Sequence, residues 1–415
     1  MFRYRVITLL IAAFWLALAP GYAAAADKKD EAKNQPPPIN AVTGKAINEA
    51  IGFLNKQQYD QAVAVLSKLK LDKMAPYWRS KIEQIYANID SNRGNYKGAR
   101  EHFQKAIDAG GLNQVDIDQI RYVIAHLYMV EGNWRKGVEA LEEWFRTTKT
   151  KPNAGAYYLL AVAYYQLKDY EKSLTAAKKA VEISEKPSEN RLQLVLALQL
   201  QLQRYAASIP TLGELIALDS GNKTYWIQLS SIYAEMQDYA DATAVMQVAY
   251  DGGILKDDSD YRRLASLLMY TSVPYRAGMI LNKEINDGHV KGDSKAYETL
   301  ANAWIAAREY QKSIAPLQKA AEQSKDGELY MRLGQVHVQL AQWQEASDAF
   351  NSAVNKGGLS DPGNADEMMG IAMYNLKKLP QARDWFKKAL HYKNHRKTAE
   401  GYIQLIDSKI KVKQG

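Results

Sequence analysis

Hydrophobic and small residues recur along this chain in one pattern with one period. From Tyr59 to Leu379, a bulky residue is followed three positions later by a small one and seven positions later by an apolar one. The pattern occurs ten times, at steps of 33 to 38 residues. Its bulky positions are Tyr59, Tyr96, Trp134, Tyr170, Tyr205, Tyr239, Tyr275, Tyr310, Trp343 and Leu379. Such periodicity is typical of a stacked array of units that are each too small to bury their own apolar face.

The pattern within one unit predicts two helices. Between Ala154 and Ser184, residues follow helical spacing on both sides of a break at Lys168-Asp169. The first set is Tyr157, Leu160, Ala161 and Tyr164, and the second is Tyr170, Ser173, Leu174 and Ala177. Because Ser173 is small, the two helix axes can approach closely. The seventh occurrence is the poorest, since Gly278 and Asn282 weaken its second face; either this unit is loose or its register slips by one.

The ninth unit contains the fullest set of these residues: Tyr330, Leu333, Gly334, Trp343, Ala346, Phe350 and Ala353. Together they resemble the signature of the tetratricopeptide repeat, with His337 at a usual Tyr position. The resemblance in spacing covers residues 43–396. It implies an all-α, right-handed α-solenoid of about ten helix-turn-helix units. A basic capping helix and tail would follow at 397–415.

The N-terminal residues have the pattern of a targeting segment. Arg3 and Arg5 precede an apolar run, and Ala24-Ala25-Ala26 offers small residues for cleavage. We expect residues 1–26 to be a secretory signal peptide and the protein to be periplasmic. An uncleaved inner-membrane tether is the alternative. Residues 27–42, charged and then Pro-rich, would form an extended linker.

Positive charge is concentrated at the C-terminal end. The chain has a formal net charge of +8, and residues 377–413 alone carry eleven Lys or Arg against three acidic residues. A solvated cap explains this excess, and contact with an anionic envelope surface is the alternative. The residues for such a contact are Lys387, Lys388, Lys393, Arg396 and Lys397. Nucleic acid is not an expected partner, because this segment lacks a stacking platform.

The sequence offers little catalytic or metal-binding chemistry. The absence of Cys excludes disulfides, thiolate zinc sites and lipidation on cysteine. His391 and His395 have the i, i+4 spacing of a metal pair, but the nearby cations favour a solvated pair instead. No phosphate-binding loop or nucleophile motif is present. We expect no enzyme activity, no metal and no cofactor.

The family resemblance also implies where a partner would bind. In tetratricopeptide arrays the first helix of each unit lines a concave groove. Carried onto this sequence, that geometry selects Gln84, Asn88, Tyr122, His126, Met129, Tyr158, Val162, Tyr165, Arg263, Leu267, Tyr270, Glu298, Asn302 and Ile305. Tyr and amide side chains in such a groove suit an extended peptide or protein segment. Alternatively, the tyrosines only shield the inner curve.

A second resemblance covers roughly the later half of the chain. It rests on Val273–Ala277, Leu300–Trp304, Asp326–Tyr330 and Lys356–Leu359. These segments look like secreted repeat proteins encoded beside TonB, ExbB and ExbD components in Gram-negative bacteria. The resemblance implies a scaffold accessory to TonB-dependent uptake of nutrients such as iron complexes. The alternative function is a binding module for anionic envelope glycan or lipid through the basic end.

Overall fold

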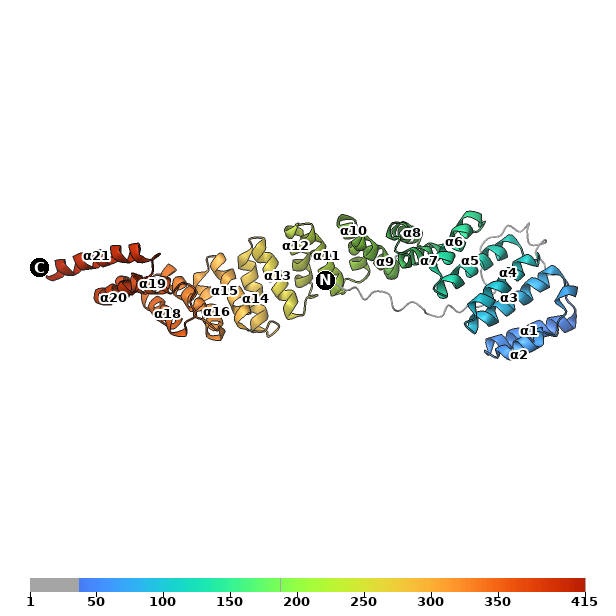
Figure 1. Ribbon diagram of the computed structural model, residues 1–415, viewed down its shortest axis with the longest axis horizontal. Coiled ribbons are helices and arrows are strands. Elements are labelled where there is room, and N and C mark those ends of the chain that lie inside the picture. The colour runs from blue at the N-terminus through green and yellow to red at the C-terminus, as the bar shows by residue number, and fades with distance from the viewer. Residues whose placement is uncertain (1–36, 187, 415) are drawn as a thin grey trace. The chain divides into compact units, whose positions relative to one another are not determined.

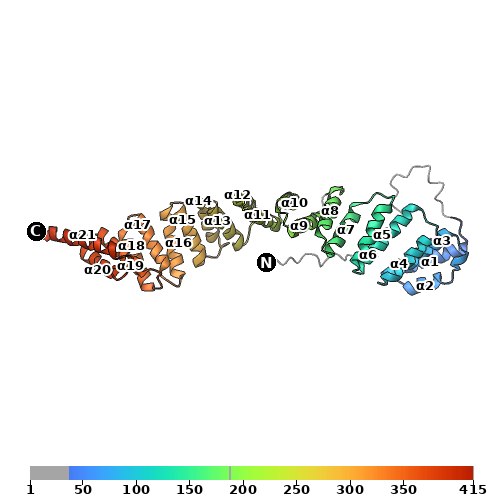
Figure 2. The same ribbon diagram turned by 45° about the horizontal axis from the view of Figure 1, so that its top comes forward.

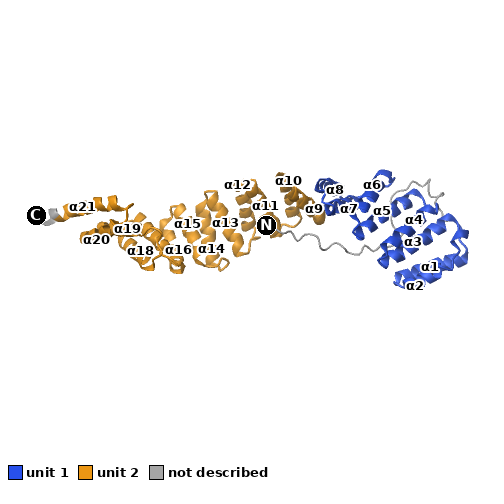
Figure 3. Ribbon diagram, in the orientation of Figure 1, with its two compact units in different colours: residues 1–184 blue, residues 185–415 orange. Residues whose placement is uncertain are grey.

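A computed structural model describes residues 37–186 and 188–414 of the chain. Across these residues it contains 21 α-helices and one short 3-10 helix, Leu71–Lys73, without any strand. None of the helices in this described part is long and apolar enough to cross a membrane. The helices form two compact units, residues 1–184 and 185–415 (Figure 3). The predicted signal peptide and most of the predicted linker lie outside the described residues.

Each unit is built from pairs of consecutive helices (Figures 1 and 2). The first unit has four pairs: α1 (Ala41–Asn55) with α2 (Tyr59–Leu66), α3 (Pro76–Asn92) with α4 (Tyr96–Asp108), α5 (Gln114–Val130) with α6 (Trp134–Thr147), and α7 (Ala154–Gln166) with α8 (Tyr170–Glu182). Helix α1 begins two residues before the predicted start of the array. Asn40 caps it, accepting a hydrogen bond from the Thr43 amide at 2.8 Å.

The second unit has six pairs and a terminal helix. The pairs are α9 (Glu189–Gln201) with α10 (Tyr205–Leu218), α11 (Lys223–Glu235) with α12 (Tyr239–Asp251), α13 (Asp258–Tyr270) with α14 (Pro274–Asn286), α15 (Ser294–Ala306) with α16 (Tyr310–Gln323), α17 (Glu328–Gln339) with α18 (Trp343–Lys356), and α19 (Pro362–Asn375) with α20 (Leu379–Ala389). The terminal helix is α21 (Arg396–Gln414). The all-α class and the array of helix pairs are confirmed.

The turn inside each pair has a fixed backbone conformation. Two residues before every second helix, φ is positive, between 54° and 81°. The residues concerned are Gln57, Gly94, Gly132, Lys168, Gln203, Gln237, Ser272, Arg308, Ala341 and Lys377. A left-handed residue reverses the chain just after the first helix, which is how a short turn can bring two helices side by side.

This turn settles the register of the seventh pair. In nine pairs the bulky residue of the sequence pattern is the first residue of the second helix, but α14 begins at Pro274, one residue before Tyr275. Counted from Pro274, the small and apolar positions are Ala277 and Leu281, and both are 0% exposed. Tyr275 is 46% exposed and Asn282 also lies at the surface. The assignment of Gly278 and Asn282 to these positions was therefore wrong by one residue.

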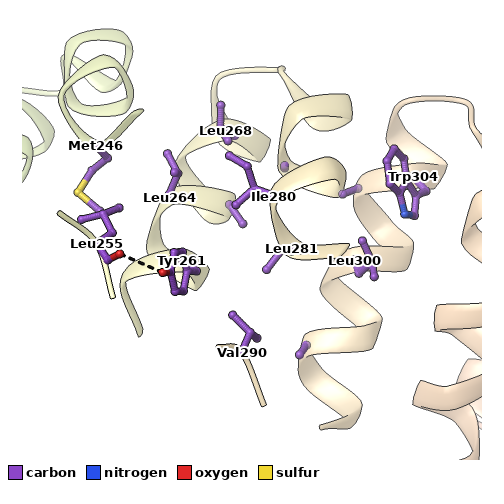
Figure 4. Close-up of a cluster of buried hydrophobic side chains, with 14 of the residues drawn as sticks. Met246, Leu255, Tyr261, Leu264, Leu268, Ile280, Leu281, Val290, Leu300 and Trp304 are labelled. Atoms are coloured by element: carbon purple, nitrogen blue, oxygen red, sulfur yellow. Dashed lines mark hydrogen bonds between the residues drawn. The ribbon is translucent and has the colours of Figure 1, made fainter. Parts of the chain in front are cut away.

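The corrected register explains the core around the seventh pair. Leu281 points into a cluster with Leu264, Leu268 and Leu300 (Figure 4). The Tyr261 hydroxyl donates a hydrogen bond to the Leu255 carbonyl at 2.9 Å, so its polar atom is satisfied inside this cluster. Because α13, α14 and α15 all contribute side chains, the core is shared between pairs.

Polar contacts join successive first helices, and α19 to the terminal helix α21, through residues in the first turns of these helices or just before them. Each contact links two residues about one repeat apart, with sequence separations of 31 to 37 residues. They are Lys81 with Asp116, Tyr225 with Glu189, Lys223 with Asp260, Arg262 with Asp293, the Ser360 amide with Glu328, and His395 with Asp361. These contacts add a hydrophilic edge to the apolar packing of each unit.

Two neighbouring substitutions test the register of α14. Leu281→Ala removes a fully buried side chain and is expected to cost about 2–5 kcal/mol. Asn282→Ala changes an exposed side chain and should stay within about 0.5 kcal/mol. Chemical denaturation, with hydrogen exchange across α13–α15 to localise the effect, measures both. Equal effects of the two substitutions would contradict the corrected register.

Candidate functional site

The predicted groove residues of the first unit lie on its first helices and are mostly half-buried. Gln84 and Asn88 are on α3, Tyr122 and His126 on α5, and Tyr158, Val162 and Tyr165 on α7. The Nε2 atom of Gln84 is buried and has no hydrogen-bond partner among the described residues. A buried amide of this kind costs free energy unless a partner reaches it.

Helix α5 shows how burial affects these side chains. Tyr122 packs against Trp144 with ring centroids 5.2 Å apart, and burial raises the pKa of its hydroxyl. Burial likewise lowers the pKa of His126, so its imidazole is neutral at physiological pH. Tyr122 and His126 are therefore uncharged, and these two side chains suit hydrogen bonding and apolar contact better than ion pairing.

Met129 does not belong to this surface. Only 3% of it is exposed, and it packs in the core of α5, α6 and α7. The cause is Gly137 on the facing helix: a Cβ atom there would lie 2.5 Å from Met129 Cγ, so the missing side chain makes room for the methionine. The sequence prediction of Met129 as a groove residue was wrong.

In the second unit, the register correction shifts the predicted positions of α13. The residues equivalent to those chosen on α3, α5 and α7 are Arg262, Ser266 and Met269, each one position before the predicted Arg263, Leu267 and Tyr270. Tyr270 is nevertheless 66% exposed and packs against Tyr239, with ring centroids 4.2 Å apart. Arg263 is exposed too and its guanidinium reaches the Ser231 hydroxyl of α11 at 3.5 Å.

The predicted polar residues of α15 already have a partner within the chain. Arg332 of α17 donates to a Glu298 carboxylate oxygen at 3.0 Å and also bonds to the amide oxygen of Asn302. Ile305, one turn further, is half-buried. Arg332 is thus the residue that sequence reasoning missed here, and it binds α15 to α17. A ligand would have to compete with it for Asn302.

A groove that the sequence did not predict lies between α19 and α21. It has a volume of about 480 Å³ and is lined by Tyr374, Lys397, Thr398, Gly401, Tyr402 and Leu405. Of the basic residues predicted to contact an anionic surface, only Lys397 lines it. Lys387, Lys388, Lys393 and Arg396 are exposed elsewhere, with Lys387 paired to Asp384 and Lys388 over the Trp385 ring. The helical spacing of Lys397, Gly401 and Leu405 was the available signal.

His395 fixes the start of α21 beside this groove. Its Nδ1 lies 2.7 Å from a Glu367 oxygen and its Nε2 lies 2.9 Å from an Asp361 oxygen. The side chain is only 14% exposed, so the prediction of a solvated His391–His395 pair was wrong for His395. Burial alone would lower its pKa. Hydrogen bonds to Glu367 and Asp361 outweigh that effect, and the pKa of His395 is raised.

A second cluster has ligand-type side chains but is already neutralised. Glu284, Asp287 and His289 could place three ligand atoms within 4.8 Å of one another. However, the Lys283 ammonium bonds to both Glu284 and Asp287, at 2.8 and 3.0 Å. The buried Glu284 also accepts a bond from the Tyr250 hydroxyl. The Lys283 ammonium therefore already compensates the carboxylate charges that a metal ion would otherwise neutralise.

Residues 122–188, which span α6 to α8 and most of α5, match the tetratricopeptide repeat family. No curated protein matches the chain. Similar solved structures include the APC/C heterotetramer Cut9–Hcn1, with 13% identity, a TM-score of 0.34, and coverage of 89% of this chain and 96% of that one. Another is YrrB, described as a TPR protein with an unusual peptide-binding site, with 15% identity, a TM-score of 0.36, and coverage of 46% and 96%.

A third is the TPR2AB domain of yeast Sti1 in complex with an Hsp90 peptide. It has 14% identity and a TM-score of 0.30, and the match covers 72% of this chain and 98% of that one. The sequence match and the ten helix pairs together define a tetratricopeptide-type helical array. Proteins of this class typically serve as scaffolds, and the match indicates no catalytic family.

The contacts of His395 predict a pH dependence for the α21 junction. The pKa of His395 is higher in the folded state than its unfolded value of about 6.5. The stability contributed by the imidazolium contacts is therefore fully present below about pH 6.5 and is lost as pH rises through the folded-state pKa. On the acid side, the hydrogen bond from His395 lowers the pKa of Asp361, so that contribution is lost only as pH falls through its lowered pKa.

Titration of the histidine resonances by NMR measures this directly. His395 should titrate above about 6.5, and Glu367→Gln should lower its pKa by removing one carboxylate partner. A wild-type His395 that titrates below the ordinary value would show that burial dominates.

Proposed function

We propose that this chain is a non-enzymatic scaffold that binds protein segments in a bacterial envelope complex. The observation that supports this proposal is the surface of the first helices, where Gln84, Tyr122 and Tyr158 recur at equivalent positions of successive pairs and are half-buried. Tyr165, two turns after Tyr158 on α7, is half-buried as well. Half-buried aromatic and amide groups offer contact area and hydrogen bonds without the cost of desolvating a charge.

The cellular setting of this proposal comes from the sequence. The basic, apolar and small-residue pattern of residues 1–26 supports export to the periplasm. The resemblance of the later half to secreted repeat proteins encoded with TonB, ExbB and ExbD supports a role beside TonB-dependent uptake. In that role the array would hold envelope proteins together.

A second candidate is binding of an anionic envelope glycan or lipid at the basic end. Its support is the exposure of Lys387, Lys388, Lys393, Arg396 and Lys397. Exposed lysines attract anions at long range, and salt screens that attraction strongly. Salt dependence therefore distinguishes this candidate from a half-buried, uncharged protein-binding surface.

Crosslinking in cells tests the scaffold. Tyr158→Ala with Tyr165→Ala removes aromatic contact area and should reduce the yield of captured partner protein about tenfold or more. Tyr96→Ala, another half-buried tyrosine of the first unit but on a second helix, is the matched control. Mass spectrometry identifies the partners, and osmotic-shock release with an N-terminus at Asp27 checks export.

The outcomes separate the proposals. Loss of partners only after neutralising Lys387, Lys388, Arg396 and Lys397, with steep salt dependence, would favour the anionic ligand. If partners are captured but none is a TonB-system component, the role in TonB-dependent uptake is contradicted while the scaffold function stands. If the wild type captures no protein, the scaffold function is wrong.

A further inference from the structure

We propose that the groove between α19 and α21 binds a protein segment in which an apolar side chain is flanked by carboxylates. This inference rests on the proposed scaffold function and assigns it a specific site and ligand chemistry. The site lies wholly within the last pair of the second unit and the terminal helix that follows it.

The groove has apolar walls. It is lined by Tyr374 of α19 and by Gly401, Tyr402 and Leu405 of α21, and the Tyr374 and Tyr402 rings meet edge to face with centroids 5.6 Å apart. Leu405 is 42% exposed, although it lines the same groove as these two rings. Beneath the groove, Tyr402 stacks on the buried Phe386 with ring centroids 4.5 Å apart. An apolar side chain entering here would cover Leu405 and both tyrosine rings.

The rim of the groove is basic. Lys397 lines it, is exposed and, among the described residues, forms no ion pair. Lys409 lies over the Tyr374 ring, 4.6 Å from its centroid, and bonds to the Tyr374 hydroxyl. By contrast, the cation of Arg383 on the neighbouring helix is already paired with Asp407 at 2.7 Å. Carboxylates next to the apolar side chain would complement these two lysines.

The wall formed by α21 is held in place before any ligand arrives. His395 fixes the start of the helix to Asp361 and Glu367, and Arg383 binds Asp407 near its middle. Ala399 and Ile406 are 0% exposed, so the opposite face of α21 is buried. A groove with a fixed wall loses less conformational entropy on binding than one that must form around its ligand.

The volume of the groove and its exposure to water favour a peptide over a lipid as the ligand. A volume of about 480 Å³ accommodates one large side chain and its flanking backbone. Lys397, Thr398, Gly401 and Leu405 are all exposed, so the groove is open to water along α21. An acyl chain laid in it would keep much of its apolar surface in water, whereas a peptide presents its polar backbone there.

Selection of phage-displayed dodecapeptides on the purified protein tests the inference. Enriched peptides should carry Leu, Ile, Phe or Met next to Asp or Glu. In a binding assay with a synthetic enriched peptide, Leu405→Asp and Lys397→Glu should each weaken affinity about tenfold or more, and added salt should weaken it further. Both positions are exposed, so circular dichroism should show an unchanged fold.

Matched controls isolate the groove. Leu218→Asp changes a leucine that is 44% exposed at the end of α10, and Lys393→Glu changes an exposed lysine outside the groove. Neither should alter peptide affinity. Enriched peptides without acidic residues, or binding that survives both groove substitutions, would overturn the inference.

Two further outcomes also overturn it. One is Lys397-dependent sedimentation with phosphatidylglycerol vesicles in the absence of peptide binding, which would make the occupant a lipid. The other is self-association lost on Leu405→Asp, which would make it a second copy of the chain. If crosslinked partners persist in cells carrying both groove substitutions, this site fails while the scaffold function stands.

Discussion

The close approach of two helices at a small residue is the contact on which every pair depends. At Gly334 an added Cβ atom would lie 2.3 Å from the Phe350 ring, and at Gly370 it would lie 2.8 Å from the Phe386 ring. Where serine takes the small position, its hydroxyl donates either across the interface, as in the 2.7 Å bond from Ser173 to the Ala161 carbonyl, or within its own helix, as in the 2.7 Å bond from Ser313 to the Tyr310 carbonyl. One helix therefore carries a small residue at this point, so that a large aromatic ring of the other helix can be buried against it.

Packing of this kind explains why the fold was predictable and the exact positions were not always so. The period and the small-residue spacing located nine of the ten second helices at their first residue. The seventh was misplaced because Tyr275 looked like the bulky position. Proline is favoured at the first position of a helix, so Pro274 carried the correct signal.

The predicted surface residues depended on contacts that the sequence pattern does not contain. Met129 is drawn inward by the glycine opposite it, and Asn302 is bound by an arginine from the next pair. The groove beside α21 was missed because no eleventh occurrence of the pattern marks that helix. Pairings between residues some 30 positions apart follow from how the pairs stack, and residue type alone does not specify them.

The left-handed turn residues have a consequence for the energetics of the array. Eight of the ten are not glycine, and such a residue costs roughly 1 kcal/mol or more relative to glycine at this φ. The array thus retains backbone strain at regular intervals, each time at the hinge between two helices. Its folded state is less stable than its core packing alone allows, and the turns are where further stability can be introduced without changing any packed side chain.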